Sequence, residues 1–131
     1  GLVNELKMIC HKMNINIHEV IELADTKPFG YTKFVPGPGL GGHCIPIDPF
    51  YLTWKAKQYN CDTKFIKLAG KINENVTTWT NNNILKILKN NKIDQNKCKI
   101  LFLGAAYKGD IDDLRESPAL KIMDFFSKKK N

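Results

Sequence analysis

Residues 26–49 read TKPFGYTKFVPGPGLGGHCIPIDP, and this stretch decides how the rest of the chain is interpreted. Glycine and proline are so frequent here that neither a helix nor a strand can continue through it. Loops that are held by a rigid scaffold commonly carry the chemistry of a protein. We therefore predict a long loop and look for functional residues in it first.

Three glycines of this loop, Gly37, Gly39 and Gly42, have the G-x-G-x-x-G spacing of a dinucleotide-binding turn. That turn requires a helix to begin at the last glycine, and Pro46 and Pro49 would fall inside this helix. We therefore reject a dinucleotide site of this kind. The glycines instead predict a backbone that a ligand can approach closely.

Helical patterns flank the loop on both sides. Upstream, residues 2–13 place their apolar side chains on one helical face, and Asn16 is positioned to cap a second short helix. Downstream, Asp48 is expected to cap a helix over residues 49–59. The apolar pattern over residues 63–91 predicts a long helix, although its threonine and asparagine tracts are poor helix formers and can interrupt it.

The last part of the chain predicts one strand and one helix. Residues 98–103 read CKILFL, a short apolar run typical of a buried strand. A polar loop leads from it to a helix capped by Ser117, with Pro118 as its first residue. A single strand cannot form a sheet, so we expect the chain to be truncated. The predicted units are a helical domain over residues 1–96 and the start of a second domain over residues 97–131.

The charge of the chain restricts its partners. Twenty basic residues stand against 13 acidic ones, a formal net charge of +7 that suits a phosphate-bearing ligand or an acidic surface. The lysines are scattered and do not alternate with aromatic residues, so we predict no nucleic-acid binding. Arg115 is the only arginine, which favours a planar contact with several donors that lysine cannot copy, with chance as the alternative.

The apolar runs and the cysteines indicate the cellular compartment of the protein and the state of its thiols. No apolar run approaches the roughly 20 residues that cross a bilayer, and no secretory leader pattern is present, so we predict a cytoplasmic protein without membrane contact. Cys10, Cys61 and Cys98 are predicted to be buried thiols. The spacing of cysteines and histidines fits no zinc site, so no metal is predicted.

Cys44 is the candidate nucleophile. It follows His43 and precedes a predicted helix whose positive end would favour the thiolate. Asp48, four residues later, can accept a proton or orient water at the same reacting carbon. The residues alone leave open that Asp48 is only a helix cap and that Cys44 only fills a tight turn. A cysteine hydrolase using Cys44 and His43, and a basic helical binding module without catalysis, also remain open.

Several segments together carry a family resemblance. The run PGPGLGGHCIPIDPFYL at residues 36–52 resembles the active-site loop of the UDP-glucose/GDP-mannose dehydrogenase family. The resemblance extends to LVNEL at residues 2–6, TKPFG at 26–30 and LGAAYKGDIDDLRESPA at 103–119. The sequence of the run PGPGLGGHCIPIDP looks most like the UDP-N-acetylglucosamine 6-dehydrogenase branch of this family.

This resemblance implies an NAD-dependent oxidation of the sugar at carbon 6. A first hydride transfer leaves an aldehyde, which the thiolate matching Cys44 captures as a thiohemiacetal. A second hydride transfer produces a thioester that water cleaves to the uronic acid. The covalent tether holds the aldehyde while the cofactor is exchanged. Asp48 matches the family's carboxylate that assists water or protons.

The resemblance also implies the binding residues, and it includes no metal ligand. Catalytic residues would be Cys44 and Asp48. Residues of the substrate site would be Phe34, Val35, Pro36, Gly37, Pro38, Gly39, Leu40, Gly41, Tyr107 and Lys108. Residues of the NAD site would be Cys44, Ile45, Pro46, Ile47 and Arg115.

Fold and partners follow from the same resemblance. The chain would be a mainly α fragment of an α/β enzyme, in which residues 1–96 form the helical central domain. Residues 97–131 would begin a Rossmann-like domain that binds the UDP-sugar. The partners implied are a UDP-N-acetylhexosamine and a second copy of the chain, with the long helix building the homodimer.

Overall fold

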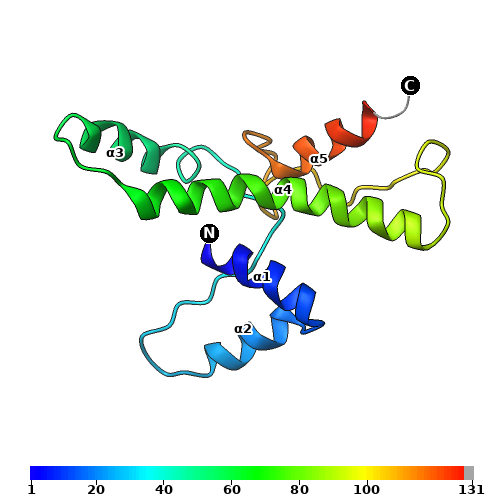
Figure 1. Cartoon of the computed structure of the whole chain (residues 1–131), viewed down its shortest axis with the longest axis horizontal. Coiled ribbons are helices and arrows are strands. Elements are labelled where there is room, and N and C mark those ends of the chain that lie inside the picture. Colours follow the sequence, from blue (N-terminus) through cyan, green and yellow to red (C-terminus); the bar gives the residue numbers. More distant parts are fainter. Residues whose placement is uncertain (129–131) are drawn as a thin grey trace.

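The computed structural model describes residues 1–128, and its regular structure is entirely helical within that range. The helices are α1 (Leu2–Met13), α2 (Ile17–Asp25), α3 (Asp48–Lys57), α4 (Lys64–Asn90) and α5 (Pro118–Ser127). The long helix α4 contacts α1, α3 and α5, while α2 contacts α1. Figure 1 shows α4 as the axis of the molecule, with α1 and α2 on one side and α3 and α5 on the other. The mainly α class is confirmed.

The pair α1 and α2 packs through a small apolar cluster. Cys10 of α1 is buried against Ile17 and Ile21 of α2, and Val3 covers the cluster. The Asn16 side chain accepts a hydrogen bond from the backbone N–H of His18 at 3.0 Å, which confirms the predicted cap of α2. This cap satisfies a backbone donor that the first helical turn leaves without a partner.

Helix α3 begins one residue earlier than predicted, and Asp48 is not its cap. Ile47 occupies the capping position, and no side chain caps the helix. The reason is that the backbone N–H of Asp48 already donates to the carbonyl of Cys44 at 2.8 Å, so Asp48 lies inside the first turn. Phe50 packs against Gly70 of α4, where a Cβ would come within 2.5 Å of the ring.

Helix α4 continues through its threonine and asparagine tracts without interruption. Burial explains this, because Val76 is completely buried and Asn73 and Asn81 are almost so. The Thr80 hydroxyl donates to the Val76 carbonyl one turn earlier at 2.8 Å, within the helix itself. Packing of the buried face thus outweighs the weak helix propensity of these residues.

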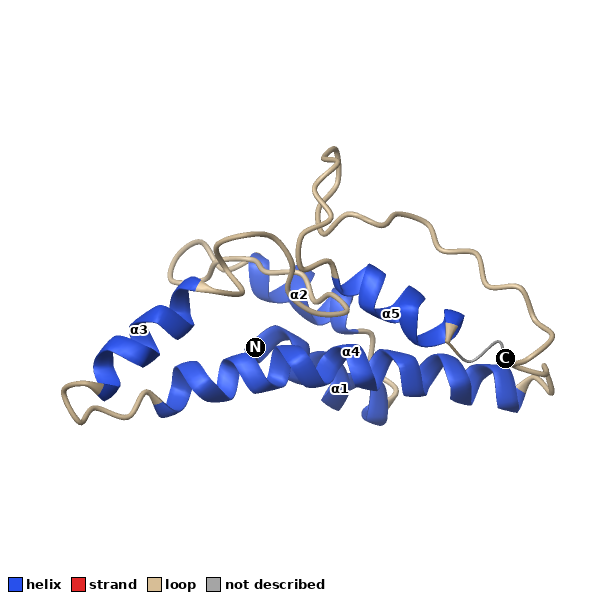
Figure 2. Cartoon of the chain, turned by 90° about the horizontal axis from the view of Figure 1, so that it is seen from above, coloured by secondary structure: helices blue, strands red, loops and turns tan. Residues whose placement is uncertain are grey.

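The predicted strand at residues 98–103 does not form. Figure 2 shows this segment as part of a long loop between α4 and α5, and no strand among residues 1–128. Leu101 and Leu103 are 82% and 89% exposed. A strand needs the backbone of a neighbouring strand for its hydrogen bonds, and the described residues offer none.

The turn before α5 also differs from the prediction. Ser117 occupies the capping position of α5, but its side chain does not cap the helix. Its hydroxyl instead donates to the carbonyl of Ala105 at 2.5 Å, and the residue is 1% exposed. Ser117 therefore ties the start of α5 to the loop that precedes it.

The burial predicted for three cysteines holds for one of them. Cys10 is buried as expected, whereas Cys61 is exposed and Cys98 is half-buried, and all four thiols of the chain are free. Cys61 and Cys98 lie in the turns beside the two ends of α4, and each donates from Sγ to a nearby carbonyl. Turns at helix ends face water, which explains the error. Among residues 1–128, no helix has the length and apolar character needed to cross a membrane.

Candidate functional site

The cysteine loop, residues 37–48, lies against α1 and α4. The backbone N–H of Gly37 donates to Oδ1 of Asn4 at 3.0 Å, and Nζ of Lys7 donates to the Gly37 carbonyl at 2.7 Å. Oγ1 of Thr77, on α4, donates to the carbonyl of Pro38 at 2.7 Å. The loop has no regular structure until α3 begins, as its composition predicted, and side chains of the helices determine its path instead.

A second loop, residues 104–117, packs on the cysteine loop, and we call it the arginine loop. The backbone N–H of Gly42 donates to the carbonyl of Arg115 at 3.0 Å. A Cβ on Gly41 would lie 2.3 Å from Cβ of Tyr107, and a Cβ on Gly42 would lie 2.9 Å from the Tyr107 ring. Gly42 also has a φ of 95°, which favours glycine. The Tyr107 side chain can therefore pack against Gly41 and Gly42 only because neither has a Cβ.

Cys44 and Asp48 share the turn that opens α3. The carbonyl of Cys44 accepts hydrogen bonds from the backbone N–H groups of Ile47 and Asp48 at 3.0 and 2.8 Å. Both Cys44 and Asp48 are exposed. The turn thus holds the thiol-bearing residue next to the amino end of a helix and leaves its surface open to a ligand.

Arg115 makes a planar contact through several donors with Asp113, two residues earlier in the arginine loop. Its Nε and Nη2 donate to Oδ1 and Oδ2 of Asp113 at 2.9 and 2.7 Å. These hydrogen bonds, helped by the Arg115 backbone N–H and slightly by His43, lower the pKa of Asp113 to about 2. They also raise the pKa of Arg115. The backbone of Arg115 is joined to the cysteine loop through the N–H of Gly42, two residues before Cys44.

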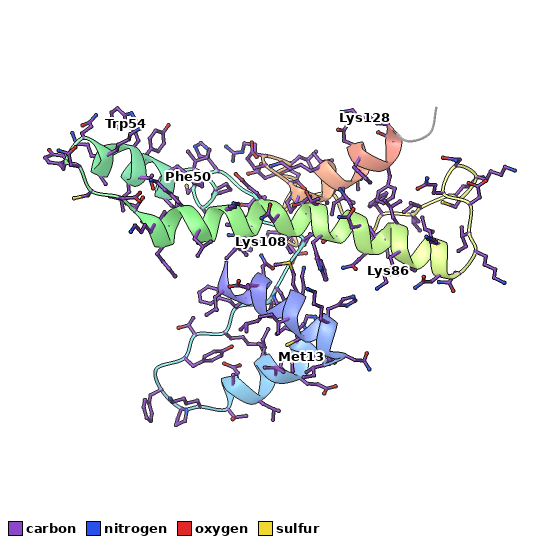
Figure 3. The ribbon with its side chains drawn as sticks, viewed as in Figure 1. Met13, Phe50, Trp54, Lys86, Lys108 and Lys128 are labelled. Carbon is purple, nitrogen blue, oxygen red and sulfur yellow. The ribbon has the colours of Figure 1, made fainter. Side chains whose placement is uncertain are left out.

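Two cavities flank the cysteine loop. One, of about 550 Å³, lies among α3, α4 and α5 and is lined by Leu40, Ile45 and Pro46 of the cysteine loop. The other is open, about 820 Å³, and is lined by Pro38 together with Tyr107 and Lys108 of the arginine loop. In Figure 3 Trp54 points outward from α3, away from both cavities.

The predicted site residues are thus brought together only in part. Gly37, Pro38, Gly39, Leu40, Gly41, Cys44, Ile45, Pro46, Ile47, Asp48, Tyr107, Lys108 and Arg115 all lie in the two packed loops. Phe34 and Val35 are each 63% exposed, and together with Pro36 they precede the packed part of the cysteine loop. Leu40 and Tyr107, both predicted to contact the sugar nucleotide, line different cavities.

Four side chains that hold the cysteine loop were not predicted from the sequence: Asn4, Lys7 and Thr77 bind its backbone, and Asn73 binds Asn4. Their spacing contains a signal, since Asn4 and Lys7 lie three apart on α1 and Asn73 and Thr77 four apart on α4, so each pair shares a helical face. Nothing in the spacing indicates which loop these faces contact, because that depends on how α1 and α4 pack.

His43 and Cys44 are adjacent in the cysteine loop, and both are exposed. In the part of the chain that is described, no hydrogen bond joins their side chains. Within residues 1–128, no group of three histidine, cysteine or acidic side chains can hold a metal ion. The site instead consists of one exposed thiol, one carboxylate and an arginine on a neighbouring loop.

Known proteins resemble this chain in both sequence and structure. The family described as "UDP-glucose/GDP-mannose dehydrogenase family, central domain" matches residues 1–75. A UDP-N-acetyl-D-mannosamine dehydrogenase of Methanococcus vannielii is 38% identical over 129 residues, which are 98% of this chain and 29% of the relative. One of Campylobacter jejuni is 42% identical over 123 residues, 94% of this chain and 28% of the relative.

A solved structure agrees with these sequence matches. The UDP-D-ManNAc dehydrogenase of Pyrococcus horikoshii superimposes with a TM-score of 0.88 at 38% identity, over 97% of this chain and 29% of that protein. The chain therefore spans less than a third of the length of the curated relatives that it matches. The similarity covers both loops of the site.

Proposed function

The chain belongs to the UDP-glucose/GDP-mannose dehydrogenase family, and on this premise we propose that it forms the cysteine-bearing part of an NAD-dependent nucleotide-sugar 6-dehydrogenase. The observation that carries the proposal is the packing of the two loops. Gly42 is hydrogen-bonded to Arg115, and Tyr107 packs on Gly41, so motifs far apart in the sequence meet beside Cys44. The resemblance assigns chemistry to both motifs, and a purely structural role for Cys44 would not require their contact.

The proposed substrate is a UDP-N-acetylhexosamine, with N-acetylmannosamine as the favoured sugar. Both curated relatives described above carry the name UDP-N-acetyl-D-mannosamine dehydrogenase. The amino-acid sequence of the cysteine loop had favoured N-acetylglucosamine. These sugars differ at one stereocentre, so a site built for one resembles a site built for the other, and the relatives' names decide our choice.

Residues 1–128 contain features that suit the phosphates and nicotinamide of NAD. The Arg115 side chain is 64% exposed. Its Nε and Nη2 are bound to Asp113, and its Nη1 has no acceptor among residues 1–128. We propose that Arg115 contacts the cofactor and that the backbone of residues 44–47 lies against its nicotinamide. NAD, when bound, supplies the acceptor for the hydrides that leave carbon 6.

Cys44 and Asp48 have separate roles in the proposal. Sγ of Cys44 adds to the aldehyde carbon, and the carbonyl oxygen takes up a proton to complete the thiohemiacetal. Loss of a second hydride converts the thiohemiacetal into a thioester. Water then cleaves the thioester to the carboxylic acid: Asp48 accepts the proton of the water, and the Cys44 thiolate leaves. Cys44 and Asp48 lie at the two ends of one hydrogen-bonded turn. The thiol and the carboxylate can therefore act on the same carbon of the substrate.

The remaining assignments concern the substrate and the assembly. Tyr107 and Lys108 line one cavity with Pro38, and we propose that Lys108 binds a phosphate of the UDP-sugar there. We assign residues 1–96 to the central domain and residues 97–131 to the start of a UDP-sugar-binding domain. A homodimer and a cytoplasmic location complete the proposal, and four free thiols suit a reducing compartment.

The decisive experiment uses a full-length protein that contains this chain. NADH is counted per UDP-N-acetylmannosamine consumed, with UDP-N-acetylglucosamine and UDP-glucose in parallel. We expect two NADH per sugar and complete loss of turnover in Cys44→Ala. Cys61→Ala is the matched control, because Cys61 is also an exposed thiol but lies in the turn between α3 and α4. Absence of NADH with every UDP-hexose, or an active Cys44→Ala variant, would refute the proposal.

A further inference from the structure

Four side chains of α1 and α4 hold one end of the cysteine loop, and we call them the loop clamp: Asn4, Lys7, Asn73 and Thr77. Both polar groups of Gly37 are bound, its N–H by Asn4 and its carbonyl by Lys7. Nδ2 of Asn4 donates to Oδ1 of Asn73 at 3.0 Å. Thr77 binds the next carbonyl along the loop, that of Pro38.

The asparagine pair is the buried centre of this clamp. Asn4 is 6% exposed and Asn73 is 8% exposed. Asn4 uses both ends of its amide, since Oδ1 accepts from Gly37 and Nδ2 donates to Asn73. A buried amide group without a partner is costly, so this arrangement favours one orientation of the Asn4 side chain and one position of Gly37.

Lys7 adds a charged contact to the clamp. Lys7 is half-buried, and this burial lowers the pKa of its ammonium group. Its Nζ donates to Gly37 and lies 5.1 Å from the centre of the Trp79 ring on α4. The ammonium thereby links α1, the loop and α4 at one point.

The other end of the same loop is held by the arginine loop. Gly42 donates to the carbonyl of Arg115, and between Gly37 and Gly42 the chain passes close to α4 and α5 at Gly39. A Cβ on Gly39 would meet Oγ1 of Thr77 at 2.9 Å and Cβ of Pro118 at 3.0 Å. The loop is therefore constrained from the clamp to within two residues of Cys44.

We propose that the Asn4–Asn73 pair, with Lys7 and Thr77, positions the cysteine loop for the oxidation at carbon 6. This inference rests on the proposed function. These are positioning residues, because they act through the loop backbone and do not touch the reacting atoms. They determine where the substrate-facing backbone of residues 37–41 lies relative to Cys44 and to the arginine loop.

The first test uses this chain alone and needs no activity. Amide hydrogen exchange is measured at Gly37 and Gly42 in the wild type, Asn4→Leu, Asn4→Asp and Asn82→Leu. Leucine has the same branched arrangement of heavy atoms as asparagine but cannot bind Gly37, so we expect faster exchange at both glycines in Asn4→Leu, by about 10- to 100-fold. The control Asn82→Leu changes an exposed asparagine on α4 and should leave both amides unchanged.

Asn4→Asp separates the effect of the lost hydrogen bonds from the effect of a larger side chain at position 4. Its carboxylate can accept from both Gly37 and the turned amide of Asn73, and Lys7, bound to the same glycine, offsets the new charge. We expect exchange close to the wild-type rate. Faster exchange at Gly37 alone, with Gly42 unchanged in Asn4→Leu, would mean that the clamp is local and would overturn the inference.

The second test measures turnover in a full-length protein that contains this chain. We expect Asn4→Leu to lower kcat/KM for the UDP-sugar by about 10- to 100-fold with KM for NAD little changed, and Asn4→Asp to restore most of it. If Asn4→Leu does not fold, Lys7→Met takes its place, because it keeps the apolar stem and removes the donor to Gly37. Wild-type kcat/KM in these variants would overturn the inference.

Failure of the proposed function gives a different pattern. In that case the wild type lacks dehydrogenase activity, while the exchange rates of Gly37 and Gly42 still decide whether the clamp controls the loop. If Asn4→Leu speeds exchange at both glycines, the clamp still positions the loop. If exchange does not change, the positioning role of the clamp is rejected, whatever reaction the protein catalyses.

Discussion

Two long irregular segments of the chain behave very differently: the cysteine loop and the apolar run at residues 98–103. The cysteine loop is rich in glycine and proline, yet hydrogen bonds to Asn4, Lys7 and Thr77 hold it in place. The apolar run has a clear strand pattern, yet Leu101 and Leu103 are exposed and no strand forms there. Residues 98–103 thus have the clearer local pattern for regular structure, yet they make fewer contacts than the cysteine loop.

The two segments depend on the rest of the molecule in different ways. An irregular loop can satisfy its backbone with individual side chains, and α1 and α4 supply them within the chain. A strand needs a row of backbone donors and acceptors from a neighbouring strand. Whether residues 98–103 become ordered as a strand therefore depends on segments that residues 1–128 do not contain.

The largest expected effect tests the apolar run directly. Leu103→Ala should change the unfolding free energy of this chain by less than about 0.5 kcal/mol, because the side chain is 89% exposed. In a full-length protein with a completed sheet the same change should cost about 2 to 5 kcal/mol. Urea unfolding of both proteins compares the two values. Equal values would mean that residues 98–103 stay outside any sheet.

Gly41→Ala tests the contact between the cysteine and arginine loops. Its Cβ would lie 2.3 Å from Cβ of Tyr107, so one loop must move, and we expect a loss of about 1 to 3 kcal/mol. Gly109→Ala is the matched control in the arginine loop, because nothing lies within 4 Å of a Cβ there. Thermal unfolding of both variants measures the difference. If Gly41→Ala unfolds like the control, the two loops are not packed as described.

Thr77→Val asks how much a single side chain contributes to the path of the cysteine loop. Valine keeps the shape of threonine but cannot donate to the Pro38 carbonyl, so we expect a loss of about 1 kcal/mol in unfolding free energy. Thr78→Val, one residue further along α4, serves as control. A stability change of the same size in both variants would trace the loss to the helix itself and leave the loop contact without a measurable role.

The smallest effect concerns the pH dependence of the arginine loop. Hydrogen bonds from Arg115 lower the pKa of Asp113 to about 2 from its ordinary value of 3.8. A lowered carboxyl pKa stabilises the folded state fully above the ordinary value, and the contribution disappears as the pH falls through about 2. An NMR titration of the Asp113 carboxyl carbon measures this. Arg115→Gln should return the pKa towards its ordinary value, and no change would assign the shift to another group.

Much of the helical scaffold was predictable, because its signals are local. Asn16 caps α2 as its position before the apolar pattern indicated, and the glycine-rich stretch is irregular until α3 begins. Asp48 was misassigned as a cap because the turn from Cys44 already includes it in the helix. Cys61 was misassigned as buried because its residue type, and not its place in a turn, guided the prediction.

The candidate site residues could be proposed from the sequence, but the contacts between them could not. The sequence by itself determined that Cys44 lies in an irregular loop ahead of a helix, because glycine and proline exclude regular structure over any length of that stretch. It also carried the motifs by which the family is identified. Only the tertiary structure decided that Asn4 and Thr77 hold the loop and that Arg115 reaches it from the other end of the chain. Backbone preferences act over a few residues, whereas such contacts depend on which helical faces meet when the chain packs.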